Sequence, residues 1–350
     1  MREMIRKVVS KMGIVGLIFT SYIMSVYAQE KIIELTYASP YAPTHPFSLA
    51  DQKWFEKIEK ETGGRVKIKP YWAGTLISSR ESMTEVAKGA ADIAFITPIY
   101  EKAGVDITKA ILDFFRGTPP EINMKIYWEI FYKFPELRKE YEKVKILGIN
   151  AAYPMFLMTT KKPVKNIDDL KGMRIRITGD VMARTMKALG AEVVSMPAAE
   201  VYEALSKGII EGVFFANADF KALRLAEVIK YATVNFLQDR GVYASRAMNL
   251  NSWAKLPPEI QKIFEANIEF WSVETYKQLL YQEEEGKELA IRNGVQFIKM
   301  DESSLEKYAK TFEEEVLKEA KALDEKGLPG TKIYNEIKKL QKEFIGKTKF

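Results

Sequence analysis

The chain has 350 residues, of which 47% are hydrophobic, so it can bury one large core or two smaller ones. Its 53 Lys and Arg residues are interleaved with 47 Asp and Glu residues, which argues against a nucleic-acid surface. It contains no cysteine, which excludes a disulfide framework, a thiol nucleophile and a thiolate metal site.

The first 28 residues have the pattern of a secretory signal peptide. Four basic residues open the chain, an apolar run follows at 12–26, and Val-Tyr-Ala at 26–28 forms a small-residue cleavage site before Gln29. The alternative, an uncleaved membrane anchor, is less favoured because the run is short for a bilayer span. No second apolar run follows. We therefore expect a cleaved, exported protein whose mature chain carries a mild positive charge.

Strands and helices alternate after the leader, which indicates an α/β fold. Gly63-Gly64 ends the first of the helices. In chain order we expect strand 32–38, helix 47–62, strand 65–71, helix 80–88, strand 93–97, helix 122–134 and strand 144–149.

The segment 170–220 reads as strand, helix, strand, helix, strand. Its first strand, at 173–177, carries Arg174 and Arg176, which alternation places on one face. A guanidinium buried in such a sheet is costly unless an anion meets it. At least one of these arginines should therefore lie at a sheet end in water or await a carboxylate.

Two junctions in the chain resemble each other. Residues 85–95 and 203–214 both read as the end of a helix, a Lys-Gly stop, an acidic residue and a strand ending in Phe. Coincidence between two ordinary helix-to-strand junctions is one interpretation. The other is that the chain contains two lobes of similar construction.

Beyond Asn251 the chain becomes strongly helical. Residues 259–292 keep a helical pattern for about 50 Å, longer than the helix of one lobe should be. The helix should therefore either break near Gly286 or span both lobes. A strand at 296–300 and amphipathic helices at 304–326 and 332–344 follow.

Catalytic residues are sparse. His45 is the single histidine, so a His cluster for zinc is excluded, and no Ser-His pair can be argued by spacing. It precedes a helix and is most simply a turn residue or helix-entry hydrogen bonder; a ligand contact is the alternative. No glycine pattern for phosphate is present. Aromatic and hydroxyl side chains instead gather at the expected strand ends, which suits a small organic anion with an apolar body.

Several long motifs support a family resemblance. They are THPFSLADQKWFEKIEKETGGRVKIKPYWAGTL, KGAADIAFITP, KKPVKNIDDLKGMRIRITG, MPAAEVYEALSKGIIEGVFF, LAEVIKYAT and NSWAKLPPEIQK. In order and spacing, residues 33–257 resemble the solute receptors of tripartite ATP-independent periplasmic (TRAP) transporters, the DctP family. The resemblance implies an α/β clamshell of the type II-like periplasmic binding proteins, with two lobes bridged by a long helix.

The resemblance also implies a site residue. The family's Gly-x-[KR]-Ile-Arg pattern aligns with residues 172–176, so the arginine that pairs with the ligand carboxylate is Arg176. A fork-shaped guanidinium explains the choice of arginine over lysine. Many relatives carry Gln-Glu-Asn where this chain has Val-Phe-Phe at 213–215, and a second arginine at the position of Phe156. These departures imply a more apolar pocket than that of receptors for sugar acids or four-carbon dicarboxylates.

These inferences combine into one set of predictions. Lobe one should comprise 29–152 and 241–281, and lobe two 153–240 and 282–350, with crossings near Tyr153 and Gly241. The ligand site should contain Arg176, with these side chains around it: Ser39, Thr97, Tyr153, Trp72, Tyr100, Phe215, Asn217 and His45.

The predicted function is periplasmic capture of a small organic acid for delivery to a TRAP membrane permease, by a monomer without a cofactor or a nucleic-acid partner. One alternative is a ligand-sensing subunit for a receptor kinase. The other is a secreted hydrolase, which the missing nucleophile and base disfavour.

Overall fold

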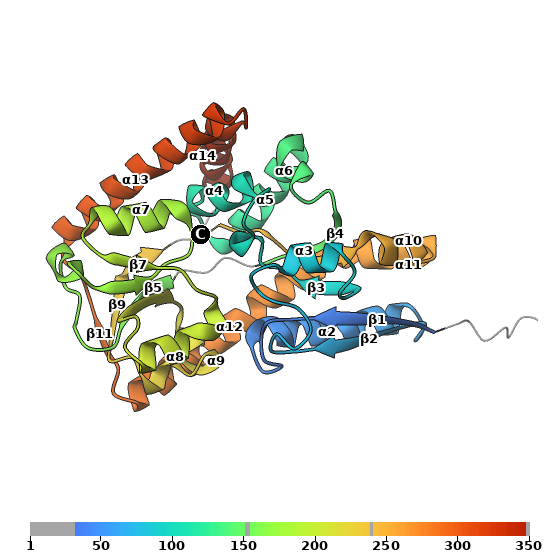
Figure 1. The fold of residues 1–350 in the computed structure, drawn as a ribbon, viewed down its shortest axis with the longest axis horizontal. Coiled ribbons are helices and arrows are strands. Elements are labelled where there is room, and N and C mark those ends of the chain that lie inside the picture. Colours follow the sequence, from blue (N-terminus) through green and yellow to red (C-terminus); the bar gives the residue numbers. More distant parts are fainter. Residues whose placement is uncertain (1–31, 151–154, 239–240, 348–350) are drawn as a thin grey trace, which may run out of the picture.

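Two separate β-sheets organise the protein (Figure 1). The computed structural model describes residues 32–150, 155–238 and 241–347. The first sheet has five strands in the order β2-β1-β3-β10-β4, and the second has six in the order β11-β9-β5-β8-β6-β7. Helices pack around both sheets, which confirms the two-lobed α/β clamshell.

Most strands of the first sheet are parallel, and the exception is β10, which comes from late in the chain. Strands β1, β2 and β3 run parallel, whereas β10 lies antiparallel between β3 and β4. In the second sheet β5 pairs antiparallel with both β8 and β9. The strand bounds are β1 Ile33–Ala38, β2 Val66–Tyr71, β3 Ile93–Phe95, β4 Val144–Ile149, β5 Met155–Thr159, β6 Arg174–Arg176, β7 Glu192–Val194, β8 Gly212–Phe215, β9 Tyr231–Gln238, β10 Ala244–Asn249 and β11 Gln296–Ile298.

The helices are mostly short, except for three long ones near the C-terminus. The α-helices are α2 Pro46–Glu61, α3 Ser82–Ala87, α4 Asp106–Phe114, α5 Pro120–Lys133, α6 Pro135–Lys139, α7 Asp180–Ala188, α8 Val201–Ser206, α9 Asn217–Ala222, α10 Leu250–Lys255, α11 Pro258–Ala266, α12 Ile268–Arg292, α13 Glu302–Glu325 and α14 Gly330–Lys347. Short 3₁₀ turns are η1 Pro98–Tyr100, η2 Ile167–Leu170, η3 Ala198–Glu200 and η4 Leu225–Glu227. Among the described residues, no helix is both long and apolar enough to cross a membrane.

The helical pattern expected over 259–292 is interrupted once. It divides at Asn267 into α11 and α12, because the Asn267 side chain donates to Ile263 O and to Glu61 of α2. The helix does not break at Gly286. A Cβ there would lie 2.0 Å from the carbonyl oxygen of Asn217, so the glycine permits α9 to approach α12 closely.

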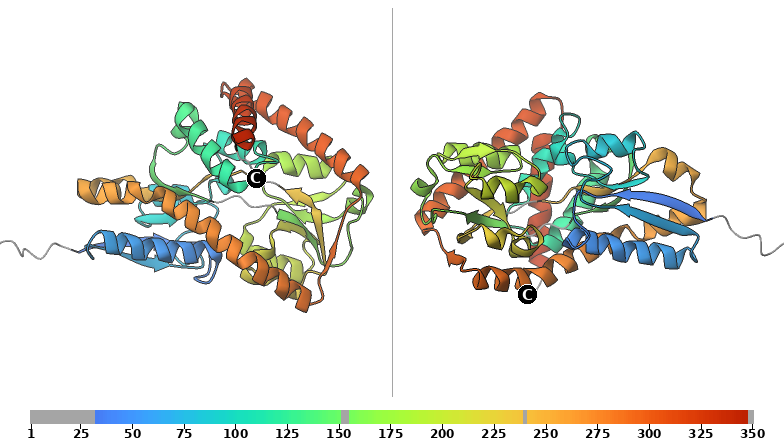
Figure 2. Two further views of the ribbon diagram at one scale, coloured as in Figure 1. Left: turned by 180° about the vertical axis from the view of Figure 1, so that it is seen from behind. Right: turned by 60° about the horizontal axis from the view of Figure 1, so that its bottom comes forward.

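Helix α12 bridges the two lobes. It packs against α2 beside the first sheet and against α9 beside the second. The left view of Figure 2 shows it running obliquely from one to the other. This confirms the bridging helix of the expected clamshell.

The two similar junctions have the same structure. Helix α3 ends at Lys88 and leads through Gly89 into β3, and helix α8 ends at Lys207 and leads through Gly208 into β8. Both glycines have positive φ, 87° and 68°, which is the left-handed cap that a Lys-Gly stop predicts.

Helix α4 is not among the elements expected from the sequence, which passed from the strand at 93–97 to the helix at 122–134. Its own N-cap residue, Val105, makes no capping hydrogen bond. Instead the Glu140 carboxylate, 33 residues away, accepts from the backbone N–H groups of Ile107 and Thr108 at 2.7 and 2.8 Å. A cap supplied by a distant residue leaves no local signal for the start of the helix.

The division of the chain between the lobes stays a proposal. The position of β10 within the first sheet supports the return of residues 241–281 to lobe one. Helices α4 and α5, however, pack on α13 and α14 from the end of the chain, so the two lobes share this helical layer. The predicted crossing near Tyr153 and the signal peptide at 1–28 lie outside the described residues.

Candidate functional site

The two arginines of β6 have different surroundings. Arg174 is partly exposed, and its guanidinium donates to the carbonyl oxygens of Gly208 and Ile209, each at 2.9 Å. It also pairs with Glu211 at 3.4 Å. These contacts hold the loop between α8 and β8, so Arg174 has a structural role.

Arg176 is buried, with 4% of its surface exposed. Its Nε donates to Met196 O at 3.1 Å, its Nη2 donates to the Tyr100 hydroxyl at 2.9 Å, and its guanidinium carbon lies 5.2 Å from the centre of the Phe215 ring. No acidic side chain within the described ranges forms an ion pair with it. A buried guanidinium that lacks an anion is costly, so this position is suited to an anionic ligand.

The hydrogen bonds of Arg176 leave one edge of the guanidinium available. Arginine has five N–H donors in a planar fork. The bonds to Met196 and Tyr100 use Nε and one Nη2 hydrogen. The remaining donors, two on Nη1 and one on Nη2, bond to no protein atom in the part of the chain that the structure describes.

Two contacts join the lobes near Arg176. Tyr100 lies in η1, which follows β3 of the first sheet, whereas Arg176 belongs to the second sheet. Arg80, in the segment before α3, donates to both carboxylate oxygens of Glu200 in η3 at 3.1 and 3.2 Å. The structure therefore has the two lobes in contact across this site.

Tyr41 belongs to the same neighbourhood, although the sequence analysis did not select it. Its ring stacks on His45 at 4.2 Å and packs edge-on against Phe95 at 5.0 Å. Burial raises its pKa well above the usual value, with Tyr243 and Tyr100 adding to this and Arg176 opposing it. Tyr41 lies in an irregular turn, where no periodicity singles out a residue.

His45 is the N-cap residue of α2. Its Nδ1 accepts from the backbone N–H of Phe47 at 3.2 Å, and the side chain is buried beneath Tyr41. This is the helix-entry role that the sequence favoured over a ligand contact. Burial, with a smaller contribution from Arg246, lowers the pKa of His45 from 6.5 to about 3.

The low pKa of His45 predicts a specific loss of stability in acid. Because the pKa is about 3 when folded and 6.5 when unfolded, the unfolded chain takes up the proton first as the pH falls through 6.5. From pH 7 to pH 5 this lowers the free energy of unfolding by about 2 kcal/mol. His45→Asn keeps a capping acceptor but does not titrate, so its stability should fall by about 2 kcal/mol less than that of the wild type. Urea denaturation at both pH values measures this, and equal falls would contradict it.

The predicted hydroxyl partners serve their own turns. The Ser39 Oγ accepts from the backbone N–H of Tyr41 at 3.2 Å. The Thr97 hydroxyl donates to Ser79 O, and its backbone N–H donates to the Ser82 Oγ at 2.8 Å. Both residues are buried, and their side-chain oxygens bond to the backbone of nearby turns.

The other predicted residues are distributed differently. Trp72 stacks on Phe55 and packs edge-on against Tyr37, within the core of the first lobe. Asn217 begins α9, and its Nδ2 donates to Glu283 of α12 at 3.1 Å. Tyr153 lies outside the described residues.

A fully buried ion pair lies behind this site in the first lobe. Arg246 of β10 donates to Asp51 Oδ1 from Nε at 3.0 Å and from Nη2 at 2.9 Å, and neither side chain is exposed. Tyr37 and Trp271 also donate to Asp51, and the Arg246 guanidinium lies 4.2 Å from the centre of the Phe95 ring. The sequence analysis did not predict this network. Arg246 is the one charged residue in the stretch 242–250, and a lone charge there indicates a buried ion pair.

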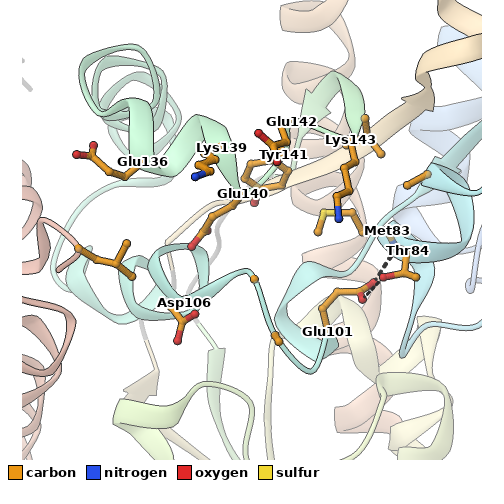
Figure 3. A pocket seen from close by; sticks show the side chains of 15 residues that line it. Met83, Thr84, Glu101, Asp106, Glu136, Lys139, Glu140, Tyr141, Glu142 and Lys143 are labelled. Carbon is orange, nitrogen blue, oxygen red and sulfur yellow. Dashed lines mark hydrogen bonds between the residues drawn. The ribbon is translucent and has the colours of Figure 1, made fainter. Parts of the chain in front are cut away.

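A separate pocket of about 480 Å³ lies between α3, α6 and the start of α4 (Figure 3). None of the predicted site residues lines it. Two of its carboxylates cap helices: Glu101 accepts from Met83 and Thr84 of α3, and Glu140 caps α4. Burial raises the pKa of Glu140 to about 7. We assign this pocket a structural role. Within the described residues, no group of three acidic or histidine side chains could hold a metal ion.

Solved structures share this architecture. A TRAP solute-binding protein from Rhodoferax ferrireducens, in complex with copurified benzoate, matches with a TM-score of 0.81 and 20% identity, over 89% of this chain and 98% of that chain. A TRAP periplasmic solute-binding protein from Bordetella bronchiseptica, with bound (R)- and (S)-mandelate, matches with a TM-score of 0.78 and 26% identity, over 89% and 99% of the two chains.

Sequence comparison points to the same family. A monocarboxylate 2-oxoacid-binding periplasmic protein from Nostoc sp. is 27% identical over 216 residues, which are 60% of this chain and 58% of the relative, less than two thirds of its length. The family model of the bacterial extracellular solute-binding proteins, family 7 (DctP), matches residues 37–322. The chain therefore belongs to the DctP family of bacterial extracellular solute-binding proteins.

Proposed function

We propose that this protein captures a small organic carboxylate outside the cytoplasm by lobe closure and delivers it to a TRAP-type membrane permease. It acts as a receptor, without chemistry and without a cofactor, and works as a monomer. Its signal peptide at 1–28 directs export and is cleaved after Ala28, which N-terminal sequencing of the exported protein checks.

The single observation that carries this proposal is the buried guanidinium of Arg176, which has no acidic partner among the described residues. Burying a cation costs several kcal/mol unless an anion compensates it. A carboxylate ligand supplies that anion, and the pair strengthens as closure excludes water.

The hydrogen bonds of Arg176 define how the carboxylate binds. Because Nε and one Nη2 hydrogen are used within the protein, the ligand carboxylate pairs with the remaining donors on Nη1 and Nη2. The Tyr100 hydroxyl accepts from Arg176, so its own hydrogen remains to donate to the same carboxylate. Tyr100 and Arg176 come from different lobes, so both contact the ligand only when the lobes are closed.

The ligand body is apolar or aromatic. The Phe215 ring lies beneath the Arg176 guanidinium, and Phe156 of β5 pairs directly with Phe215 of β8. The Bordetella relative that binds mandelate, an aromatic monocarboxylate, supports this class, as does the Nostoc relative that binds monocarboxylate 2-oxoacids. The remaining proposed contacts are Ser39, Thr97, Trp72, Tyr153, Asn217 and His45, with Tyr41 added from its place beside Tyr100.

A thermal-shift screen of the purified mature chain against monocarboxylates, dicarboxylates, aromatic carboxylates and uncharged analogues tests the function. A true ligand at about 100 times its Kd adds about 2.7 kcal/mol to the stability of the folded state. We expect shifts with aromatic or apolar monocarboxylates and none with their amides. Equal stabilisation by acids and amides, or no shift with any acid, would overturn the proposal.

The ion pair between Arg80 and Glu200 predicts slower ligand release at low salt. Both side chains are about half exposed, at 56% and 52%, so the pair contributes modestly. Glu200→Gln should raise the ligand dissociation rate by no more than about fivefold, and the difference from the wild type should vanish in 1 M salt, where the Debye length is about 3 Å. Stopped-flow release measures this. The control is Glu203→Gln, which removes a pair within α8 and should not alter the rate.

A further inference from the structure

A second pocket lies next to the Arg176 site, between the second sheet and the bridging helix. Its volume is about 660 Å³. Most of its lining is apolar: Phe156, Val234, Leu237, Leu280 and Phe297. Phe156, which lines the pocket, lies on β5 and pairs with Phe215 of β8, the strand that borders Arg176, so the pocket is close to the candidate ligand site.

The pocket is built by a large bulge in β9. Leu157 pairs with Thr233, but the preceding residue of β5, Phe156, pairs with Leu237, so residues 234–236 have no partner on β5. Asn235 fixes the bulge by bonding to the backbone N–H and carbonyl of Met300. Bulges of this kind re-aim side chains next to functional sites. Here Val234 and Leu237 line the pocket.

Opposite the pocket, Phe236 packs on the other face of the sheet, against Phe214 at 5.3 Å and Tyr308 at 4.7 Å. The two faces of the sheet near the bulge therefore differ. The face that carries Phe236 is covered by aromatic packing, and the opposite face, which carries Val234 and Leu237, lines the pocket.

A continuous row of side chains connects this pocket with Arg176. The order of neighbouring strands is β6, β8, β5 and β9. Arg176 pairs with Val213, two residues before Phe215; Phe215 pairs with Phe156; and Phe156 pairs with Leu237. Paired residues, and residues two apart on a strand, share a face of the sheet. At about 4.8 Å per strand, Phe156 lies two strands, or about 10 Å, from the strand of Arg176.

The far end of this row, in the pocket, is not suited to binding a second carboxylate as Arg176 is proposed to bind the first. Glu283 and Lys287, one turn apart on α12, both line the pocket, so their charges offset each other. Glu283 already accepts from Asn217 Nδ2 and from the backbone N–H of Ala218, each at 3.1 Å. The Asn217 Oδ1 is buried with no hydrogen-bond partner among the described residues, and it can only accept. A second carboxylate would gain little there.

We propose that the ligand site extends from Arg176 along the row Phe215, Phe156 and Leu237 into this pocket, and that the protein accordingly binds elongated monocarboxylates with an apolar tail, such as ω-aryl alkanoates. This inference rests on the proposed function. It refines the ligand class from a compact acid to one with its charge at a single end and an apolar body that spans at least two strands.

A homologous series of ω-phenyl alkanoates tests the length of the site. Calorimetric titration of the purified chain with benzoate, phenylacetate, 3-phenylpropanoate and 5-phenylpentanoate should give a Kd that falls about two- to fourfold for each added methylene. A Kd that is lowest for benzoate and rises with every methylene would overturn the extended site while leaving the proposed function intact. If no carboxylate of any length binds, the proposed function fails, and this inference fails with it.

Variants that fill the pocket assign the length dependence to it. In Val234→Trp the ratio of the benzoate Kd to the 5-phenylpentanoate Kd should collapse toward one. Leu280→Trp fills the pocket from α12 and should do the same, which keeps the test available if Val234→Trp does not fold. Ile291→Trp, at an exposed position of the same helix that does not line the pocket, is the matched control and should keep the wild-type ratio. An unchanged ratio in a folded pocket variant would overturn the assignment.

Discussion

Replacing Arg176 with alanine is expected to weaken binding of the carboxylate ligand by about 2–5 kcal/mol, or roughly 30- to 5,000-fold in Kd. The guanidinium is buried and is the proposed partner of the ligand carboxylate, so its removal would leave that carboxylate desolvated without a partner. Calorimetry with the acid identified by the thermal-shift screen measures the loss.

Two further variants separate charge from geometry. Arg176→Lys keeps the charge but loses the planar fork and the bond to Met196 O, so it should also bind weakly. Arg174→Ala should bind like the wild type, because Arg174 bonds to the loop at Gly208 and Ile209. Thermal unfolding of each variant shows that it is folded. A crippling effect of Arg174→Ala with a harmless Arg176→Ala would refute the assignment.

Strand alternation and motif alignment were enough to select Arg176 over Arg174. Alternation placed both arginines on one face, and the alignment distinguished them. The structure supplies the physical difference between them. Arg174 begins the strand at the surface, whereas Arg176 ends it beneath Tyr100 of the opposite lobe. This opposition of lobes is a long-range property, so periodicity could not reveal it.

The residues around Arg176 differ in part from those that the sequence suggested. Hydroxyls at strand ends were reasonable candidates, but Ser39 and Thr97 satisfy the backbone of the turns that follow their strands. Short hydroxyl side chains readily bond to nearby backbone groups, and this competes with their use in ligand binding. Tyr41 gives no such local signal, because it reaches the site from an irregular turn.

The same reason explains why the helix break at Asn267 and the start of α4 were not predicted. The side chain that stabilises each is far away in the chain: Glu61 accepts from Asn267, and Glu140 caps α4. By contrast, the Lys-Gly stops of α3 and α8 are set by the left-handed conformation of a single glycine, so the sequence predicted them. Prediction succeeded where the determinant was local.

The buried pair between Asp51 and Arg246 should be the most sensitive point for stability. Asp51→Ala is expected to lower the free energy of unfolding by about 3–5 kcal/mol, because it leaves a fully buried guanidinium without its anion. It also removes the acceptor of the Tyr37 hydroxyl and the Trp271 indole N–H. Urea denaturation, read as the midpoint and the m-value, measures the loss.

A double variant tests whether the cost comes from the unpaired charge. Asp51→Leu with Arg246→Met removes both charges, so it should recover much of the loss, as apolar replacements of buried pairs do. Recovery should stay incomplete, because Tyr37 and Trp271 still lack an acceptor. Glu259→Ala, which breaks the partly exposed pair with Arg65, is the control and should cost less than about 1 kcal/mol. A similar loss in Asp51→Ala and in the double variant would show that the lost acceptor, and not the stranded arginine, sets the cost. Because Trp271 lies on α12, the same variants also report how firmly the first lobe holds the bridging helix.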